Sequence, residues 1–590
     1  IFSPKGRPPI NPPLSPSPTP QFPIWEDELY LEFHRGCYTT HADQKRWNRY
    51  CEGLLYQAEL FAALATIGCG VMYPKAELEA AWKKVLFHQF HDILPGSSIT
   101  QVYVDALPIW QEVEKVGHEI LQQSLSAIAS SIDLPTPPYP EAQPIVVFNP
   151  LNWVRSEVVE IPFSKVDDEQ SFDWLICNLD GQEIQSQARF IESRRNANGE
   201  TFVQSVSFFA NDIPACGYRV FWLCPYKPSL QSHEQIQEFV LENEFLRVEV
   251  SQKTGDLSSV FDKILHREVL SAPGNQLQAF RDEGQYWDAW NIDPNYAQHP
   301  LPPAELLSIH HLERGTLRSR IRVVRRIGQS TFSQDYMLEK ESAVLKIATT
   351  VNWQERHVLV KAAFPLNIEA DFATYEIPCG AIRRPTKPET PAEKAKWEVP
   401  ALRWTDLTSS PTPQYGVSLL NDCKYGYDSQ PNQLRLTLLR SPSWPDPEAD
   451  LGYHEFTYAL YPHSGSWEAA HTVRRGYELN LPMQVMLLSS QPEESNGSLA
   501  PVGRLLTLSA ENLILMAFKQ AEGDQQHWIL RCYECHGEPR ELHLQSDLGL
   551  ALGEPVDLLE RPLPTPDLSS GQQNFTIQPW KIASFQVKNP

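Results

Sequence analysis

Apolar residues near the start of the chain recur every three or four positions, which is the spacing of amphipathic helices. Three such stretches have short connections: 47–65, 78–86 and 99–128. Gly68 to Gly70 end the first, and Pro108 is expected to bend the third. Because each stretch has a single apolar stripe, we predict an antiparallel three-helix bundle over residues 25–134.

Beyond a proline-marked linker at 135–140, the pattern changes to short runs of alternating apolar and polar residues. The clearest predicted strands are 157–161, 202–208, 245–250 and 318–324. Thr254-Gly255-Asp256 is predicted to be a hairpin turn. The fold class we expect is α+β multidomain, with the antiparallel three-helix bundle followed by antiparallel β-sandwich domains.

The β-rich part is too long for one pair of layers, so we divide it. The expected units are a small β-domain at 141–232, a large β-sandwich domain at 233–483 and a C-terminal β-domain at 484–590. No repeat period is evident, which counts against a propeller or a solenoid. Residues 1–24 are crowded with proline and predict an extended arm.

Composition narrows the class of partner. The chain has 590 residues, and 50 Lys and Arg stand against 73 Asp and Glu, a formal charge of −23. Such a charge disfavours nucleic acid and anionic membranes and suits neutral ligands such as sugars. No secretory leader and no apolar run of membrane-spanning length is evident. The ten cysteines lack framework spacing, so we expect reduced thiols and a cytoplasmic location.

The second helical stretch ends in a group of candidate ligands. His88 and His91 are three positions apart and His88 and Asp92 four apart, so on a continuing helix they share one face and can converge on a cation. The spacing alone also fits a simpler interpretation. A histidine near a helix C-terminus complements the helix dipole, and an aspartate before a turn satisfies backbone donors.

The residues after this group predict a change of chain direction. Pro95 and Gly96 stop the second helix. Ser98 and Gln101 have the spacing of a capping box at the start of the third. We therefore expect His91 and Asp92 to lie at a rigid corner of the backbone.

The run Cys532-Tyr-Glu-Cys535-His536 matches the spacing of covalent haem attachment. Residues 527–544 alternate as two strands around Gly537, and in a strand Cys532 and Cys535 point to opposite faces. No second pair of this kind is present to complete a four-thiolate zinc site. We therefore expect neither haem nor a cysteine-bound zinc.

Several motifs occur together in one order. They are 28–42, 82–98, 147–153, 241–247, 286–293, 420–428 and 438–442. The segment Trp82 to Ser98, with its Phe-His-Asp-Ile-Leu-Pro-Gly core, resembles the signature of glycoside hydrolase family 38, the zinc-dependent retaining α-mannosidases. Phe90 suits the cytosolic and bacterial branch. The resemblance extends from about residue 25 to the C-terminus and implies a helical middle domain followed by β-domains.

The resemblance also implies roles for two residues. It carries one zinc ligand to His91 and a contact with a substrate hydroxyl to Asp92. In the family, an N-terminal barrel supplies a His-x-Asp pair and an Asp that both binds zinc and attacks the sugar. Nothing before residue 25 can form that barrel. We therefore expect a truncated gene product or one half of a split enzyme, whose partner chain carries the catalytic barrel.

Two further positions in the helical region match the family less directly. His34 stands where the Golgi branch has a Trp lining the sugar pocket, which makes it a substrate-side candidate. Tyr38 is either a second such residue or a packed aromatic that steadies the loop. Close relatives commonly have Asn where His88 stands, and we expect this side chain to be exposed rather than an added ligand.

The large β-domain contributes other candidates. Arg440 resembles a family arginine that reaches the active-site mouth, where a guanidinium binds several hydroxyls; the alternative is a pair with an acid such as Asp422. Asp288 between Trp287 and Trp290 fits a sugar platform with a polar anchor, although tryptophans buried in a core are the commoner explanation.

The sequence thus predicts part of an α-mannosidase that binds a mannoside or oligosaccharide and shares one zinc ion with ligands outside the chain. The alternative is a non-catalytic carbohydrate-binding or assembly subunit derived from such an enzyme. A barrel with His-x-Asp encoded upstream of Ile1 would favour the enzyme. A third possibility is a decayed fragment, unstable because it exposes the surface that the barrel should cover.

Overall fold

The structure of the chain is a computed structural model, and its described residues fall in nine ranges. These are 24–164, 173–192, 202–226, 238–284, 286–409, 414–488, 498–523, 526–563 and 575–589. The predicted proline-rich arm at 1–24 lies outside them, apart from Ile24.

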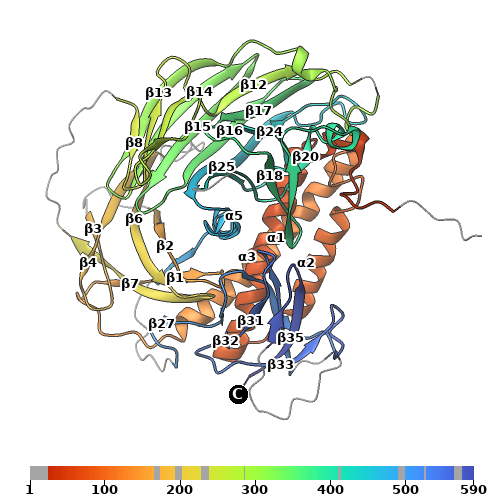
Figure 1. Ribbon diagram of the computed structural model, residues 1–590. Coiled ribbons are helices and arrows are strands. Elements are labelled where there is room, and N and C mark those ends of the chain that lie inside the picture. Colours follow the sequence, from red (N-terminus) through yellow and green to blue (C-terminus); the bar gives the residue numbers. More distant parts are fainter. Residues whose placement is uncertain are drawn as a thin grey trace, which may run out of the picture.

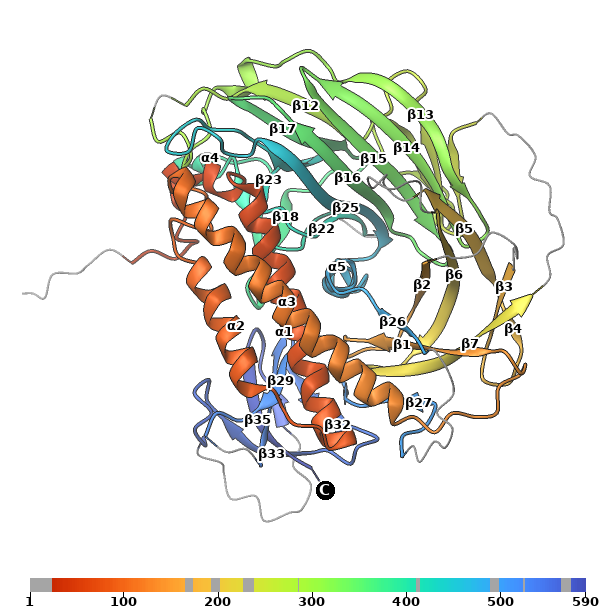
Figure 2. The ribbon, with the colours of Figure 1, turned by 180° about the vertical axis from the view of Figure 1, so that it is seen from behind.

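Three long helices form one flank of the molecule, as Figures 1 and 2 show from opposite sides. They are α1 (Ala42–Cys69), α2 (Lys75–His88) and α3 (Thr100–Ser130). They pack through a shared apolar cluster of Cys51, Leu55, Ala81, Val85, Ala106, Trp110 and Val113. Gly70 caps α1 with a φ of +72°, close to the predicted end, and α3 continues through Pro108. All three predicted helices are therefore present.

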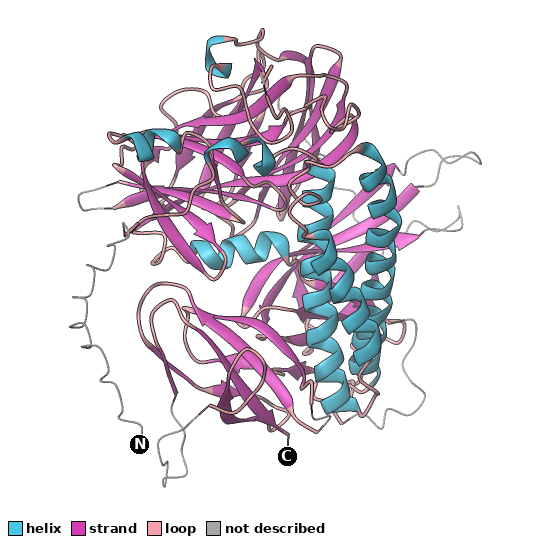
Figure 3. Ribbon diagram, turned by 90° about the vertical axis from the view of Figure 1, so that its right-hand side faces the viewer, coloured by secondary structure: helices cyan, strands magenta, loops and turns pink. Residues whose placement is uncertain are grey.

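The short helices are found in connecting segments. They are η1 (Glu32–His34), η2 (Gly36–Tyr38), η3 (Tyr296–Gln298), α4 (Pro391–Ala395) and α5 (Thr472–Asn480). Figure 3 shows how few helices the molecule has outside the flank, with strands filling most of the rest. Within the described part of the chain, each helix is too short or too polar to cross a membrane.

The small β-domain consists of two facing sheets. One sheet has the spatial order β26 (Gln484–Leu487), β1 (Gln143–Asn149), β7 (Gly217–Tyr226), β3 (Asp173–Cys177), β4 (Glu183–Ile184), with β27 (Val502–Gly503) also paired to β7. The other has the order β2 (Arg155–Ser164), β6 (Phe202–Ile213), β5 (Ser186–Glu192). Their inner faces enclose an apolar core that includes Val147, Ile161, Phe208 and Phe221.

Membership of β26 and β27 corrects one predicted boundary. Ile145 pairs with Leu487, and Arg219 pairs with Val502. Residues 484–487 and 502–503 therefore belong to the sheet of the small domain, and the division predicted at 484 falls inside that sheet.

The large β-sandwich is built from three sheets over one core, which includes Val248, Leu277, Ile347 and Val360. Nine strands have the order β13 (Glu305–Arg314), β14 (Arg318–Ile327), β15 (Ser330–Glu339), β16 (Leu345–Trp353), β25 (Gly452–Ser464), β22 (Tyr415–Asn421), β21 (Trp404–Thr408), β18 (Phe372–Ile377), β19 (Gly380–Pro385). Five have the order β12 (Gln276–Arg281), β17 (Val358–Pro365), β24 (Gln433–Leu439), β23 (Gly426–Gln430), β20 (Val399–Pro400). Four have the order β11 (Arg267–Glu268), β10 (Leu257–Asp262), β9 (Leu246–Val250), β8 (Val240–Glu242).

The C-terminal strands pack on the lower part of the helical flank (Figure 1). One sheet has the order β29 (Leu513–Gln520), β30 (Trp528–Glu534), β35 (Ile582–Lys588), β33 (Ala551–Val556). Two strand pairs accompany it: β28 (Thr507–Leu508) with β32 (Leu544–Gln545), and β31 (Arg540–Leu542) with β34 (Phe575–Ile577). A single apolar cluster contains residues of α1 and α3 together with residues of β1, β7, β29 and β30. The helices therefore connect the small β-domain to the C-terminal β-domain.

The predicted strands and the predicted hairpin are confirmed. The runs 157–161, 202–208 and 318–324 fall within β2, β6 and β14, and the run 245–250 matches β9 except for Phe245. β9 and β10 pair antiparallel around the 254–256 turn, where Gly255 has a φ of +74°.

Candidate functional site

The turn that follows α2 is pressed against the segment that leads into α1. Gly96 has a φ of +85°, and a Cβ there would meet the carbonyl oxygen of Thr40 at 2.5 Å. The buried Lys45 ammonium donates to the carbonyl oxygens of Thr40 (2.5 Å) and Leu94 (2.9 Å). Burial lowers the pKa of Lys45 to about 8. These contacts fix turn 89–98 against the start of the helical flank.

His91 and Asp92 project from this braced turn into solvent. Their side chains are 78% and 43% exposed, and His91 Nε2 lies 3.5 Å from Asp92 Oδ2. The Ser97 hydroxyl donates to Asp92 Oδ1 (3.3 Å), while the Ser98 hydroxyl donates to the Asp92 carbonyl oxygen (2.9 Å). The Phe90 ring packs 4.2 Å from the imidazole centroid. The backbone of the pair is thus held in place while both functional groups remain accessible.

The expectation for His88 is wrong. Its side chain is only 2% exposed, its Nδ1 lies 2.7 Å from the Lys84 carbonyl oxygen, and its ring packs 4.7 Å from that of Trp110. The helix ends at His88, so the backbone changes direction before His91. The predicted common face therefore does not form, and His88 is part of the helical core.

The predicted capping box is also wrong. The N-cap of α3 is Ile99, without a side-chain cap. The Ser98 hydroxyl is occupied by the Asp92 carbonyl, and Gln101 donates to Asp105 (2.8 Å). Ser98 therefore stabilises the preceding turn instead of opening the next helix.

The described residues do not form a zinc site by themselves. Nowhere among them do three or more His, Cys, Asp or Glu side chains gather in a way that could hold a metal. His91 and Asp92 are too few, because zinc sites in proteins generally have three or four protein ligands. An accessible imidazole beside an accessible carboxylate fits only a part of such a site.

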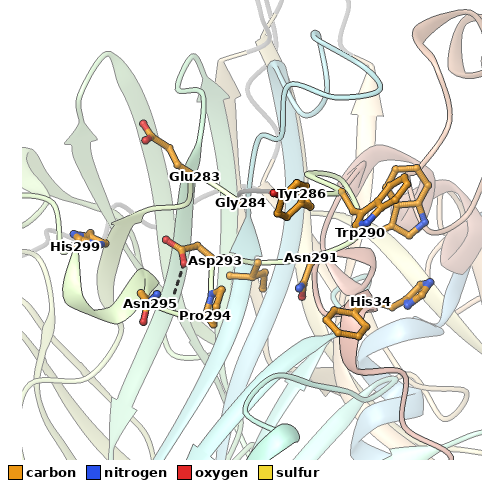
Figure 4. Close-up of a pocket in the computed structure, with 13 residues that line it drawn as sticks. His34, Glu283, Gly284, Tyr286, Trp290, Asn291, Asp293, Pro294, Asn295 and His299 are labelled. Atoms are coloured by element: carbon orange, nitrogen blue, oxygen red, sulfur yellow. Dashed lines mark hydrogen bonds between the residues drawn. The ribbon is translucent and has the colours of Figure 1, made fainter.

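A pocket of about 820 Å³ opens beside the segment that precedes α1 (Figure 4). Its aromatic and polar wall includes Phe33, His34, Tyr286, Trp287, Trp290 and Asn291. His34, the predicted substrate-side residue, is therefore part of a real cavity. Two polar atoms in this wall, His34 Nδ1 and Asn291 Oδ1, are buried without a hydrogen-bond partner among the described residues.

The tryptophans of the wall form a cluster at the pocket edge. Trp287 is 60% exposed, and its ring centroid lies 5.9 Å from those of both Trp290 and Trp444. The alternative of a buried core tryptophan is therefore wrong for Trp287. Asp288 faces the other way: it is 8% exposed and its Oδ2 accepts from the Ser443 amide (2.6 Å). The tryptophans therefore cluster at the surface, and Asp288 is turned away from them.

Arg440 lies beneath the loop between β12 and η3 and does not reach solvent. This corrects the expectation that it reaches the active-site mouth. Its side chain is fully buried. Its guanidinium donates to Asp282 Oδ2 (2.7 Å), to Thr40 Oγ1 (3.0 Å) and to the carbonyl oxygens of Asp288 (2.7 Å) and Asn291 (3.0 Å). The acid partner is thus Asp282 and not Asp422. Arg440 therefore holds the loop between β12 and η3 against the segment before α1.

His41, a buried histidine at the start of α1, contacts α3 and the segment between β24 and β25. The His41 ring stacks on that of Tyr103 (3.5 Å between centroids), and its Nε2 lies 3.0 Å from Asp446 Oδ2. Asp446 also accepts from Thr100 Oγ1 (2.5 Å), at the start of α3. Burial opposes a charge on the imidazole, but hydrogen bonds to Asp43 and Asp446 outweigh it and raise the pKa of His41 to about 9.

Three sequence profiles match the chain in the order in which these elements occur. The alpha mannosidase middle domain covers residues 32–128, which hold His34, His91 and Asp92. The glycosyl hydrolases family 38 C-terminal domain covers 241–448, and the family 38 C-terminal beta sandwich domain covers 512–585.

The chain belongs to glycoside hydrolase family 38.

Two curated relatives are identical to this chain at 31% of the aligned residues. Alpha-mannosidase 2C1 of Mus musculus is 31% identical over 576 residues, which are 96% of this chain and 51% of that protein. Alpha-mannosidase 2C1 of Homo sapiens is 31% identical over 587 residues, again 51% of its length. The chain thus spans about half the length of the curated relatives it matches.

Solved family 38 structures have the same fold. An alpha-mannosidase from Enterococcus faecalis V583 superposes with a TM-score of 0.76 over 94% of this chain and 68% of its own, at 18% identity. Because the identity is low, this likeness concerns architecture only. It agrees with the helical flank and β-domains seen here.

The cysteines of this family 38 chain form no disulfide bonds. All ten are free. Cys532 on β30 and Cys535 just after it are both buried, but they belong to different apolar clusters, as the predicted alternation requires. Burial raises the pKa of the Cys532 thiol to about 12. The two thiols are therefore core residues.

The surroundings of Tyr38 distinguish its two interpretations. Tyr38 is half-buried and burial raises its pKa well above the usual range, which favours the packed aromatic over the substrate contact.

Two residues that line the pocket, Asn291 and Phe33, were not recognised from the sequence, although both adjoin residues that the motifs singled out. The dense aromatic run at 286–290 was the available signal.

Proposed function

We propose that this chain is the middle and C-terminal part of a zinc-dependent retaining α-mannosidase that acts on terminal α-mannosyl residues. The observation that carries the proposal is the accessible pair His91 and Asp92 on a turn that Gly96, Lys45 and Ser98 hold rigid. An exposed imidazole and carboxylate supported in this way are typical of a site completed by other ligands.

In this proposal His91 donates one nitrogen to a zinc ion whose other ligands lie outside the described residues. When bound, the zinc would act as a Lewis acid that holds hydroxyls of the sugar ring. Asp92 accepts hydrogen bonds from a substrate hydroxyl, which helps to orient and distort the ring. His34 contacts the substrate from the pocket side. The nucleophile and the acid are supplied by a barrel on a partner chain or elsewhere in the same protein.

The free cysteines support a reducing, cytoplasmic setting for this enzyme. The formal charge of −23 supports a neutral substrate such as a mannoside or oligosaccharide over nucleic acid or an anionic membrane.

The test is hydrolysis of 4-nitrophenyl α-mannoside by the purified protein together with any chain that co-purifies with it, with and without added zinc. We expect activity that requires zinc and is lost in His91→Ala, together with the bound zinc measured by atomic emission. His310→Ala is the matched control, because His310 is exposed on β13, far along the chain from the turn. Unchanged activity and zinc content in His91→Ala would refute the assignment.

A non-catalytic carbohydrate-binding or assembly subunit is the second candidate function. The aromatic pocket favours it, because this pocket is formed within the chain itself. A folded protein that binds sugars but hydrolyses no α-mannoside under any of these conditions would establish this alternative.

A further inference from the structure

Two cysteine sulfurs lie in contact within the small β-domain. Cys177 ends β3 and Cys224 lies in β7, and their Sγ atoms are 3.9 Å apart. The two strands are hydrogen-bonded neighbours in one sheet (Figure 1). Both cysteines are fully buried. The contact is made by two residues of one domain, so it does not depend on any part of the protein outside the described residues.

The alternation of side chains along these strands separates the pair from the core of the domain. Ile176 and Leu223 point into the core between the two facing sheets. Their neighbours Cys177 and Cys224 therefore point to the other face of the sheet. On that face, an apolar cluster is formed by Ala142, Leu175, Cys177, Trp222 and Cys224. The two sulfurs are thus brought together in a small apolar layer of their own.

The register of the two strands disfavours a disulfide. Cys177 is opposite Trp222, and Cys224 is opposite Leu175, so the two cysteines are diagonal neighbours. Diagonal Cα atoms in an antiparallel pair lie about 7–8 Å apart, whereas a disulfide joins Cα atoms no more than about 7 Å apart. Oxidation would require one strand to shift, so the register keeps the pair as two thiols.

Burial also protects the two thiols from common reagents. It raises the pKa of both thiols, that of Cys224 to about 12, because an apolar environment disfavours the thiolate. The thiolate is the form that attacks peroxides and alkylating agents, so both sulfurs react slowly with them at neutral pH. A ligand of this pair must bind sulfur strongly enough to displace a proton, which is a property of soft metal ions.

The distance between the sulfurs and their number select among these ions. Two sulfurs that bind one ion through bonds of about 2.3 Å lie roughly 3.8–4.6 Å apart, from a tetrahedral to a linear arrangement. The observed 3.9 Å is within this range. A structural zinc would need two more ligands, and the described residues contain no group of three or more that could hold a metal. Cu(I) is selected by thiolates and can be bound by two sulfurs alone.

We propose that Cys177 and Cys224 form a two-coordinate site for Cu(I) in the small β-domain. Each sulfur binds the ion and releases its proton to water, so two thiols and one Cu(I) give a bis-thiolate complex without a change in oxidation state. Because β3 lies beside the short edge strand β4, the bound ion would cross-link the edge of this sheet to β7. Hydrolysis of a mannoside plays no part in this binding.

The experiment is an anaerobic titration of the purified chain with Cu(I), in which bicinchoninate is the competing chelator. We expect one Cu(I) per chain, two sulfur ligands in its X-ray absorption spectrum, and a melting temperature that rises when the ion is bound. Cys177→Ser and Cys224→Ser each remove one of the two ligands, so the affinity should fall by more than about 100-fold.

A second pair of variants separates binding from folding. If a serine hydroxyl unfolds the domain, which circular dichroism would detect, Cys177→Ala and Cys224→Ala keep the cluster apolar. These variants should show the same loss of Cu(I) while they remain folded.

Two control variants locate the binding. Cys216→Ser is the matched control, because Cys216 is equally buried in the same domain, and its Sγ lies 3.8 Å from the Pro150 carbonyl oxygen. Cys379→Ser tests a competing site, because Cys379 Sγ lies 3.9 Å from Met516 Sδ. Both variants should bind Cu(I) as the parent protein does.

Four results would overturn the inference. Folded parent protein might retain no Cu(I) against the chelator, or the variants at Cys177 and Cys224 might bind it as tightly as the parent. Loss of the ion in Cys379→Ser with full binding in the Cys177 and Cys224 variants would assign it to the other pair. A disulfide between Cys177 and Cys224 after treatment with hydrogen peroxide, detected by mass spectrometry, would contradict the diagonal geometry that keeps the two thiols apart.

Discussion

The segment between β12 and η3 has two sides that treat polar groups in opposite ways. On the inner side, Arg440 is fully buried and its guanidinium is hydrogen-bonded to a carboxylate, a hydroxyl and backbone carbonyls. On the pocket side, Asn291 Oδ1 makes no hydrogen bond within the described residues, as is also true of His34 Nδ1 on the segment before α1, and aromatic rings are exposed. The segment between β12 and η3 thus has hydrogen-bonded polar groups against one side and unpaired polar atoms on the other, within the described residues.

The difference indicates a division of labour. Satisfied buried networks rigidify a structure, because each group loses its partner if any other moves. Unsatisfied polar atoms and exposed rings lower stability but remain available to a ligand. The hydrogen bonds on the inner side therefore hold the pocket side in place. Substitutions on the two sides should separate stability from binding.

The largest effect is expected from Arg440→Met. It leaves Asp282, which is 1% exposed, as an unpaired buried carboxylate, so the free energy of unfolding should fall by about 3–5 kcal/mol. Urea denaturation followed by circular dichroism measures it. Arg281→Met is the control, because its ion pair with Glu283 is exposed and should be worth under about 1 kcal/mol. Equal losses in the two variants would break the comparison.

His41→Asn should destabilise the protein in a way that depends on pH. Because the pKa of His41 is raised to about 9 in the folded protein, its stabilisation is complete below the unfolded value of about 6.5 and is lost as the pH rises through 9. We expect a loss of roughly 2–3 kcal/mol at pH 6 that is much smaller at pH 10. Asn is chosen because position 41 has a φ of +55°. A loss that does not vary with pH would show that stacking on Tyr103, not charge, holds the site.

Gly96→Ala tests whether the turn carrying His91 is held by contact with Thr40. A Cβ would have to displace a backbone carbonyl and adopt a positive φ, which together should cost about 1–3 kcal/mol. Gly70→Ala is the matched control, with a φ of +72° and nothing within 4 Å of the added carbon. The difference between their melting temperatures isolates the contact. If Gly96→Ala is no worse than Gly70→Ala, the turn is not braced as described.

The smallest change in stability is expected on the pocket side. Tyr286→Ala removes a ring that is 77% exposed, so the free energy of unfolding should change by no more than about 0.5 kcal/mol. The same urea titration measures it. A loss above about 1.5 kcal/mol would mean that the aromatic wall is structural, and the contrast between the two sides would disappear.

Local patterns predicted the elements of this fold well. The helical stripes and alternating strands were readable because their periods reflect which face is buried. Sheet membership was not, since β26 pairs with β1 more than three hundred residues away and nothing in a local alternation names its partner. The boundary at 484 failed for that reason.

The candidate site was predicted only in part. The motif placed His91 and Asp92 correctly at a corner, and His34 at a cavity. The same spacing argument misplaced His88, because it assumed a helix that continues past the point where the backbone turns. Burial of Arg440 also escaped prediction, because an arginine between a strand and a Ser-Pro turn gives no sign that a distant aspartate will enclose it.

Completion of the small domain's sheet by β26 and β27 bears on synthesis at the ribosome. Strands β1 and β7 emerge early, yet their outer partners follow only after the entire large sandwich has been translated. Until then, the edge of β1 presents unpaired backbone groups to any other strand in solution. The nascent chain therefore passes through an interval in which the intervening sandwich can fold but its neighbour cannot close, and that interval is when a chaperone would be most useful.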